Sequence, residues 1–232
     1  MENRIRRITV RNAQLSPAQA EMWITVVPEH QTPTTEVRGR LMGPRCPYSS
    51  TVEVAYPLRP LSPSQKPTEP GGLTRRVIIP EAILWEPQCP FLYEGPIELW
   101  QDGQRCERVV VRHGMRSLQW KEHALHVNGR PLTLRGQRIA SCSDQEATLL
   151  HEKEYNLFIA PVTASSLAMW EQADRFGFLV LGQLGEDANE TRLTETLRPH
   201  VSCLGWLSAE CRALTAEEAV AWYLAHGNPG SM

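Results

Sequence analysis

The 232-residue sequence has almost no net charge and no long apolar run. Lys and Arg number 24 and Asp and Glu number 26, so the formal net charge is -2, and the basic residues are scattered along the chain. A field this weak does not attract a polyanion, which excludes nucleic acid as an expected partner. No stretch approaches the roughly 20 apolar residues of a membrane span, and no apolar core segment follows the basic start MENRIRRITV. We therefore expect a soluble, cytoplasmic protein without a membrane partner.

Motifs that bind metals, nucleotides or cofactors are lacking as well. The sequence contains no GxSxG, no Walker loop and no GxGxxG. His123 and His126 would lie on opposite faces of a strand, so they do not form a metal pair. No CxxC pair occurs, and we expect most of the six cysteines to be reduced, small apolar core residues, namely Cys46, Cys89, Cys106, Cys142, Cys203 and Cys211. The sequence thus predicts no metal site and no cofactor.

Up to about Trp120, short alternating runs separated by Pro, Gly and polar turns predict half-buried antiparallel strands. The side chains expected to share a face within a run are Met22, Ile24 and Val26, then Val52, Val54 and Tyr56, then Ile97 and Leu99. Further runs cover residues 5–10, 35–41, 76–79 and 108–111. About seven strands result, the number used by an immunoglobulin-like β-sandwich, and Asp102-Gly103 predicts a hairpin between the last two.

Residues 57–72 read PLRPLSPSQKPTEPGG, in which five prolines remove backbone donors. We expect a loop here. A loop this long inside a sandwich is either functional or disordered, and loop statistics favour the disordered alternative.

From about Leu125 the apolar period changes, and strand-like runs alternate with helical ones. The expected strands are PLTLRG, NLFIAPV, FGFLVLG and VSCLGWL. Four helices are expected. The first starts at a capping box of Ser143 and Glu146, and the second covers about 165–176 and stops at Gly177. The third covers about 189–197, and the fourth starts at a capping box of Thr215 and Glu218. Four βα units make about half of a (β/α) barrel, since a complete one takes about 250 residues. We therefore predict an immunoglobulin-like β-sandwich over residues 1–122, followed by a partial (β/α) TIM-barrel-like domain over 123–232.

Several stretches resemble glycoside hydrolase family 2, the β-galactosidase, β-glucuronidase and β-mannosidase group. The family pattern W-x-P-x-x-P-x-L-Y is matched by LWEPQCPFLY, and a later G-x-R run leads through an N-G-[KR]-P hairpin into the first barrel strand. The matching positions are Trp85, Pro87, Pro90, Leu92, Tyr93, Gly114, Arg116, Asn128, Gly129, Arg130, Pro131, Arg135 and Gly136. Weaker similarity continues through EKEYNLFIAPV, WEQADRFGFLVLGQL and SCLGWLSAE. The resemblance implies the same two domains, without the jelly-roll domain that family members carry ahead of the sandwich.

The resemblance also indicates where catalytic carboxylates would lie. Retaining glycosidases use two carboxyl groups about 5 Å apart, one as acid/base and one as nucleophile. In the family the acid/base is the Glu of an N-E pair after the fourth strand, which makes Glu210 the candidate here. However, Ala209 replaces the Asn, and the spacing from Trp206 is one residue short. Since the nucleophile belongs to a later strand, we expect Glu210 to be a vestigial acid/base.

Other positions that contact sugar in the family have lost their polar function in this sequence. At the ends of the first three expected strands, the residues differ from those of the family. They are Gln137, Arg138, Ile139 and Ala140 after the first strand, Ile159, Ala160 and Pro161 at the second, and Gly182 and Gln183 at the third. Single Trp residues within apolar runs are expected in the core, namely Trp85, Trp100, Trp120, Trp170, Trp206 and Trp222. The acidic residues Glu186, Asp187 and Glu190 are expected at a solvated helix start.

Three hypotheses for function remain. The first is a non-catalytic relative of the family that acts as a binding or interaction protein, or survives as a structural remnant. A half-barrel leaves open strand edges and an uncovered inner face, so we expect a homo-oligomer, a partner chain, the Pro-rich loop or the C-terminal helix to cover it. The second is a glycosidase completed by a partner chain. The third is a carbohydrate-binding module that uses Trp100 or Trp120 as its platform.

Overall fold

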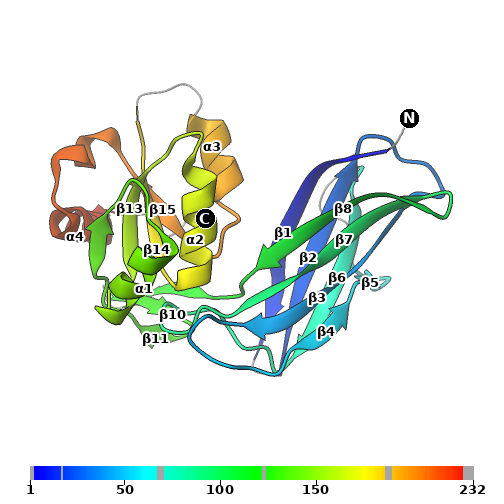
Figure 1. Cartoon of the computed structure of the whole chain (residues 1–232), viewed down its shortest axis with the longest axis horizontal. Helices are drawn as coiled ribbons and strands as arrows, with labels where there is room; N and C mark the ends of the chain where they lie inside the picture. The colour runs from blue at the N-terminus through cyan, green and yellow to red at the C-terminus, as the bar shows by residue number, and fades with distance from the viewer. Residues whose placement is uncertain (1–2, 17, 67–70, 122–123, 186–189, 227–232) are drawn as a thin grey trace. The chain divides into compact units, whose positions relative to one another are not determined.

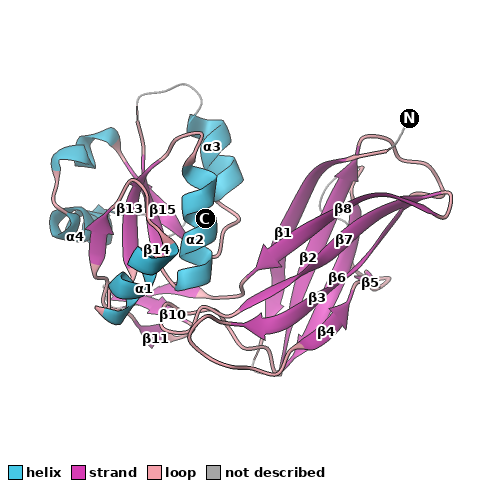
Figure 2. Cartoon of the chain, viewed as in Figure 1, coloured by secondary structure: helices cyan, strands magenta, loops and turns pink. Residues whose placement is uncertain are grey.

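The computed structural model describes residues 3–16, 18–66, 71–121, 124–185 and 190–226, and the chain divides into two compact units (Figure 1). The first unit comprises Met1–Arg45, Ser50–Ile83 and Leu92–Met115, and the second comprises Cys46–Ser49, Leu84–Phe91 and Arg116–Met232. The expected boundary at residues 122 and 123 lies outside the described residues. Two short segments far ahead of it in the sequence, residues 46–49 and 84–91, belong to the second unit. All described helices belong to the second unit too (Figure 2).

Two four-stranded antiparallel sheets form the first unit. In spatial order, one sheet contains β1 (Ile5–Leu15), β2 (Gln19–Pro28), β6 (Leu73–Pro80) and β5 (Arg59–Pro60). The other contains β4 (Val54–Pro57), β3 (Glu36–Arg45), β7 (Leu92–Gln101) and β8 (Gln104–His113). All seven expected strands are present, and the short β5 is an addition to them.

The predicted alternation is present in β7, whereas β2 is buried on both faces, since Glu21, Trp23 and Thr25 are buried as well. Met22, Ile24 and Val26 of β2 are buried, as are Ile97 and Leu99 of β7. Each set lies on one face of its strand, because successive side chains of a strand alternate between faces. Burial of these side chains supplies the apolar area that stabilises two packed sheets.

The expectation for TVEVAY is wrong in part. The strand β4 starts only at Val54, and the side chains of Val52 and Val54 are 85% and 47% exposed. Because β4 is a four-residue strand at a sheet edge, its apolar residues meet few neighbours. The turn between β7 and β8 is as predicted, since Asp102 and Gly103 both have positive φ (51° and 76°).

Part of the Pro-rich loop lies on the first sheet. Arg59 and Pro60 form β5 and pair with Arg76 and Arg75 of β6. Further along the loop, Nε2 of Gln65 donates to Oε1 of Glu21 at 2.8 Å. These contacts hold residues 59–65 in place, in contrast to the disordered alternative, and residues 67–70 lie outside the described residues.

The second unit contains a four-stranded parallel sheet with helices, and a small antiparallel sheet. In spatial order the parallel strands are β12 (Gly136–Arg138), β13 (Leu157–Pro161), β14 (Leu179–Gln183) and β15 (Cys203–Leu207). The helices are α1 (Asp144–Glu152), α2 (Ser166–Phe176), α3 (Glu190–Leu197) and α4 (Ala216–His226), with a 3-10 helix η1 (Ala209–Ala213). The antiparallel strands are β9 (Leu118–Lys121), β10 (Ala124–Val127) and β11 (Arg130–Pro131). None of the described helices combines the length and apolar character needed to cross a membrane.

The first parallel strand starts later than the PLTLRG run predicted. Residues 132–135 are not strand, and β12 begins at Gly136. The reason is the side chain of Asn156, whose Oδ1 accepts from the backbone N–H of Arg135 and whose Nδ2 donates to the carbonyl of Thr133. A side-chain amide therefore bonds the backbone that the prediction assigned to the β ladder.

The helix signals were predicted correctly. Ser143 and Glu146 form the capping box of α1, and Thr215 and Glu218 exchange the same two hydrogen bonds before α4. Gly177 ends α2 in the left-handed conformation, with φ 81°. These signals depend on neighbours in sequence, so they could be read without the fold.

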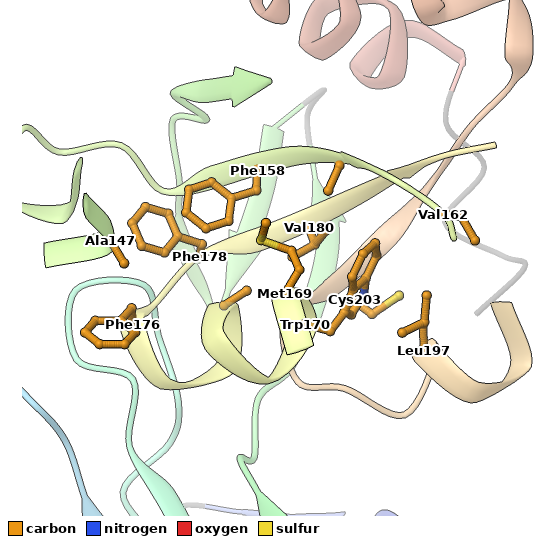
Figure 3. Close-up of a cluster of buried hydrophobic side chains, with 12 residues drawn as sticks. Ala147, Phe158, Val162, Met169, Trp170, Phe176, Phe178, Val180, Leu197 and Cys203 are labelled. Atoms are coloured by element: carbon orange, nitrogen blue, oxygen red, sulfur yellow. The ribbon is translucent and has the colours of Figure 1, made fainter. Parts of the chain in front are cut away.

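One face of the parallel sheet packs on α1 and α2 (Figure 3). The rings of Phe158 and Phe178 stack with their centroids 3.9 Å apart, and Trp170 of α2 is fully buried in the same cluster. Phe158 of β13 and Val180 of β14 belong to this cluster. Residues 157, 159, 179 and 181 therefore point to the opposite face, because strand residues alternate.

The opposite face of the sheet is covered by α4 of the same chain (Figure 1). Val220 of α4 lies against the Cα of Gly136 and beside Leu157, since a Cβ at residue 136 would be 3.1 Å from Val220 and 3.2 Å from Leu157. At the other side of the sheet, Oη of Tyr223 donates to the carbonyl of Leu204 at 2.8 Å. The C-terminal helix thus lies across a face that the sequence left uncovered, and it buries Leu157 completely.

Candidate functional site

A cavity of about 510 Å³ lies where the parallel strands end. Open α/β sheets place their ligands outside the carboxyl ends of the strands, which makes this cavity the candidate site. Its wall contains residues that end or follow β12, β13 and β14, and one residue of η1, namely Arg138, Ile139, Ala140, Ile159, Pro161, Val162, Thr163, Gln183, Gly185 and Arg212.

Arg138, the last residue of β12, is held by hydrogen bonds to the backbone. Its Nε donates to the carbonyl of Leu214 at 2.7 Å, and its Nη2 donates to the carbonyl of Cys211 at 2.5 Å. A longer bond of 3.4 Å joins Nη1 to Oε1 of Gln183. The guanidinium therefore fastens η1 and the residue after it to the end of the sheet.

Gln183 at the end of β14 makes a second connection to the same segment. Its Nε2 donates to the carbonyl of Ser208 at 2.6 Å, and it lies 3.4 Å from the carbonyl of Leu207. Arg138 and Gln183 thus add side-chain donors to backbone carbonyls near the end of the sheet, and the carbonyls of Leu207, Ser208 and Cys211 also accept from backbone N–H groups. Both side chains hold the fold at this point in addition to lining the cavity.

The described wall of the cavity contains no Asp or Glu, and its two charged residues are Arg138 and Arg212. Glu210, predicted as a vestigial acid/base, lies on η1 as an exposed side chain and is not part of that wall. Among the described residues, the wall therefore lacks the pair of carboxyl groups that glycoside hydrolysis uses. Its chemistry is that of a cationic site with an apolar wall.

The strand ends singled out in the sequence meet at this cavity only in part. Residues 138–140, Ile159, Pro161 and Gln183 line it. Gly182 points elsewhere, because a Cβ at this position would lie 2.4 Å from the ring of Trp206. Arg212 and Thr163 were not predicted, and no local signal in the sequence marks either residue.

The two tryptophans proposed as sugar platforms, Trp100 and Trp120, already contact other side chains. The guanidinium of Arg38 lies 4.4 Å from the ring centroid of Trp100, and Nε1 of Trp100 donates to Glu98. The ring of Trp120 lies 5.9 Å from that of Tyr223, and its Nε1 is buried. Trp85 and Trp170 are fully buried, which confirms the core prediction for these two residues.

The remaining candidates from the sequence are spread over the fold. Cys203 and Cys211 are buried, whereas Cys46, Cys89, Cys106 and Cys142 are half-buried. His123, Glu186 and Asp187 lie outside the described residues, while Glu190 begins α3 as expected. Among the residues that the structure describes, no three His, Cys, Asp or Glu side chains gather as a metal site would require.

A second polar cluster lies at the other end of the sheet. Nδ1 of His200 is 2.6 Å from Oδ2 of Asp174, and Oδ1 of Asp174 accepts from the backbone N–H of Ser202 at 2.8 Å. Nearby, burial lowers the pKa of Arg116 to about 10, and its Nη2 donates to the carbonyl of Cys203. Because these residues join α2 to the turn before β15, the cluster positions the last strand.

The ion pair of His200 and Asp174 predicts a pH-dependent stability. Burial by itself lowers the pKa of His200, but the hydrogen bond to Asp174 and its charge raise it, and the net shift is upward. A raised pKa in the folded state contributes stability that is complete below about pH 6.5, the ordinary His value, and is lost as the pH rises through the folded value. Denaturant unfolding of the whole chain between pH 5.5 and 8.5 should therefore show decreasing stability with a weaker slope in His200→Gln. His126→Gln serves as the control, and equal slopes in wild type and His200→Gln would contradict the prediction.

Comparison with known proteins identifies the fold. The structure is similar to that of a β-glucuronidase from Parabacteroides merdae, with TM-score 0.64 and 15% identity, covering 88% of this chain and 29% of that one. A glycosyl hydrolase family 2 member from Bacteroides cellulosilyticus gives TM-score 0.60 and 17% identity, covering 87% and 30%. A β-glycosidase from Bacteroides vulgatus gives TM-score 0.64 and 17% identity, covering 96% and 32%.

These similarities establish a fold like that of a fragment of family-2 glycoside hydrolase structures. The chain spans about 30% of the length of the structures it matches, as the 29%, 30% and 32% coverages show. At 15–17% identity the likeness concerns the fold and not the activity. The sequence matches no protein-family model and no curated protein.

Proposed function

We propose that this chain is a non-catalytic relative of the family-2 glycoside hydrolases that acts by binding a ligand. The observation that carries the proposal is the carboxylate-free described wall of the cavity at the carboxyl ends of the strands. Open α/β sheets bind ligands at this place, so the position suits a ligand site while the residues do not suit hydrolysis.

The architecture supports the relationship. Four consecutive strands of one parallel sheet, separated in sequence by α1, α2 and α3, have the order of the first half of a (β/α) barrel. The antiparallel sheets of the first unit fit the immunoglobulin-like domain that precedes the barrel in the resemblance. We therefore assign the two units to a sandwich and a half-barrel.

The hydrogen bond of Gln183 supports the absence of turnover. In a glycosidase, the polar groups at the strand ends must be available to the sugar and to a pair of carboxyl groups about 5 Å apart. Here the amide of Gln183 is already used, because its Nε2 donates to the carbonyl of Ser208 at 2.6 Å. Turning this amide toward a sugar would break that hydrogen bond.

A turnover assay tests the proposal directly. We expect the purified chain to release no more 4-nitrophenol than buffer does from 4-nitrophenyl β-glucuronide, β-galactoside and β-mannoside. Glu210→Gln tests the residual acid/base role, and Glu217→Gln is its matched control, because Glu217 is an exposed Glu of the same unit. Turnover that purifies with the chain and disappears in Glu210→Gln, but persists in Glu217→Gln, would contradict the proposal.

A further inference from the structure

We propose that the cavity at the strand ends binds a small organic anion, a carboxylate or phosphate attached to an apolar body. The inference rests on the proposed function and names the ligand class of the same site. A cationic guanidinium without a carboxylate partner among the described residues, together with an apolar wall, points to this class.

The charge of the cavity supports an anion. Arg138 uses three of the five N–H groups of a guanidinium, and all three acceptors are neutral: two carbonyls and an amide oxygen. Arg138 thus keeps its positive charge and two further donors. Arg212, the second cation of the wall, is exposed, and the structure shows no ion pair for it among the described residues.

Arg138 is also held in place before any ligand arrives. The carbonyls of Cys211 and Leu214 fix its Nη2 and Nε on one side. A fixed guanidinium loses little side-chain entropy on binding, and its planar set of donors matches carboxylate and phosphate oxygens. The arrangement is therefore that of a preorganised anion site.

The remaining wall favours an apolar body over a sugar. Ile139, Ile159, Pro161 and Val162 supply apolar surface, and the volume of about 510 Å³ is within the usual range for small-molecule sites. The hydroxyl of Thr163 already lies 3.0 Å from that of Ser165, and the amide of Gln183 is bonded to the backbone. Few polar side chains thus remain for the hydroxyl groups of a sugar.

The test uses benzoate and phenyl phosphate as probes, with benzamide as the neutral analogue and inorganic phosphate as the anion without a body. Binding to the full chain is measured by calorimetry at low salt, with thermal shift as a second readout. We expect benzoate and phenyl phosphate to bind more tightly than benzamide and inorganic phosphate. Arg212→Gln should weaken both by about tenfold, the effect of losing one charge-assisted hydrogen bond.

Three variants distinguish binding in the cavity from a general effect of removing positive charge. Arg138→Gln should abolish binding, but it also removes the bonds to residues 211 and 214, so Arg212→Gln decides the question if that variant unfolds. Arg130→Gln removes an exposed Arg of β11 outside the cavity and should bind like the wild type. Equal affinity for benzoate and benzamide, or equal weakening by Arg130→Gln and Arg212→Gln, would overturn the proposal. Failure here leaves the turnover assay unaffected, so the two proposals fail separately.

Discussion

Replacing Trp170 by Ala should lower the free energy of unfolding of the second unit by about 3–5 kcal/mol, the usual cost of removing a buried Trp from a core. Trp170 is fully buried between the sheet and α2, and its ring stacks on Trp206 with centroids 6.3 Å apart (Figure 3). The indole leaves a cavity that close-packed neighbours fill only in part. Denaturant unfolding followed by far-UV circular dichroism measures the change.

Two variants of the same helix serve as controls for this prediction. Leu167→Ala changes a residue of α2 that is 44% exposed and should cost less than about 1 kcal/mol. Trp170→Phe retains most of the buried aromatic surface, so its loss should be smaller than that of Trp170→Ala. A Trp170→Ala variant as stable as Leu167→Ala would show that this cluster does not stabilise the unit.

Replacing Gly177 by Ala should cost at least about 3 kcal/mol, because left-handed strain and a steric clash combine at this residue. Gly177 ends α2 with φ 81°, a conformation that costs an L residue about 1–2 kcal/mol. A Cβ there would also lie 2.1 Å from the backbone carbonyl oxygen of Pro87. Since a backbone atom cannot turn aside as a side chain can, either α2 or the segment 84–91 must move.

Gly129→Ala separates strain from clash. Gly129 has nearly the same φ, 80°, in the hairpin between β10 and β11, but nothing lies within 4 Å of the position its Cβ would take. This variant should therefore show the backbone strain alone, about 1–2 kcal/mol. Thermal and chemical unfolding of both variants give the difference, and equal losses would mean that the contact between residues 177 and 87 does not constrain the unit.

The sequence predicted the place of the candidate site but not its hydrogen bonds or its full set of lining residues. The expected strand ends include Arg138, Ile159 and Gln183, and the structure brings these residues to one cavity. The sequence could not show that Arg138 bonds the carbonyls of Cys211 and Leu214, which lie more than 70 residues away along the chain. Arg212 enters the site for the same reason, since η1 is folded back onto the strand ends.

Local features of the sequence determined the elements of this protein. The capping boxes at Ser143 and Thr215, the stop at Gly177 and the positive-φ turns at Asp102 and Asn128 act between residues that are neighbours in the chain. The apolar period determined the antiparallel and parallel sheets in the same way. Such signals work because caps and turns satisfy backbone groups within a few residues.

Only the tertiary structure decided which elements lie together. It placed residues 46–49 and 84–91 in the second unit, delayed β12 through the amide of Asn156, and laid α4 over the sheet face that carries Leu157. These outcomes depend on packing and hydrogen bonds between residues far apart in the chain, and no periodic pattern encodes such contacts. The composition of the cavity, with its cations and without carboxylates on the described wall, is a result of the same long-range packing.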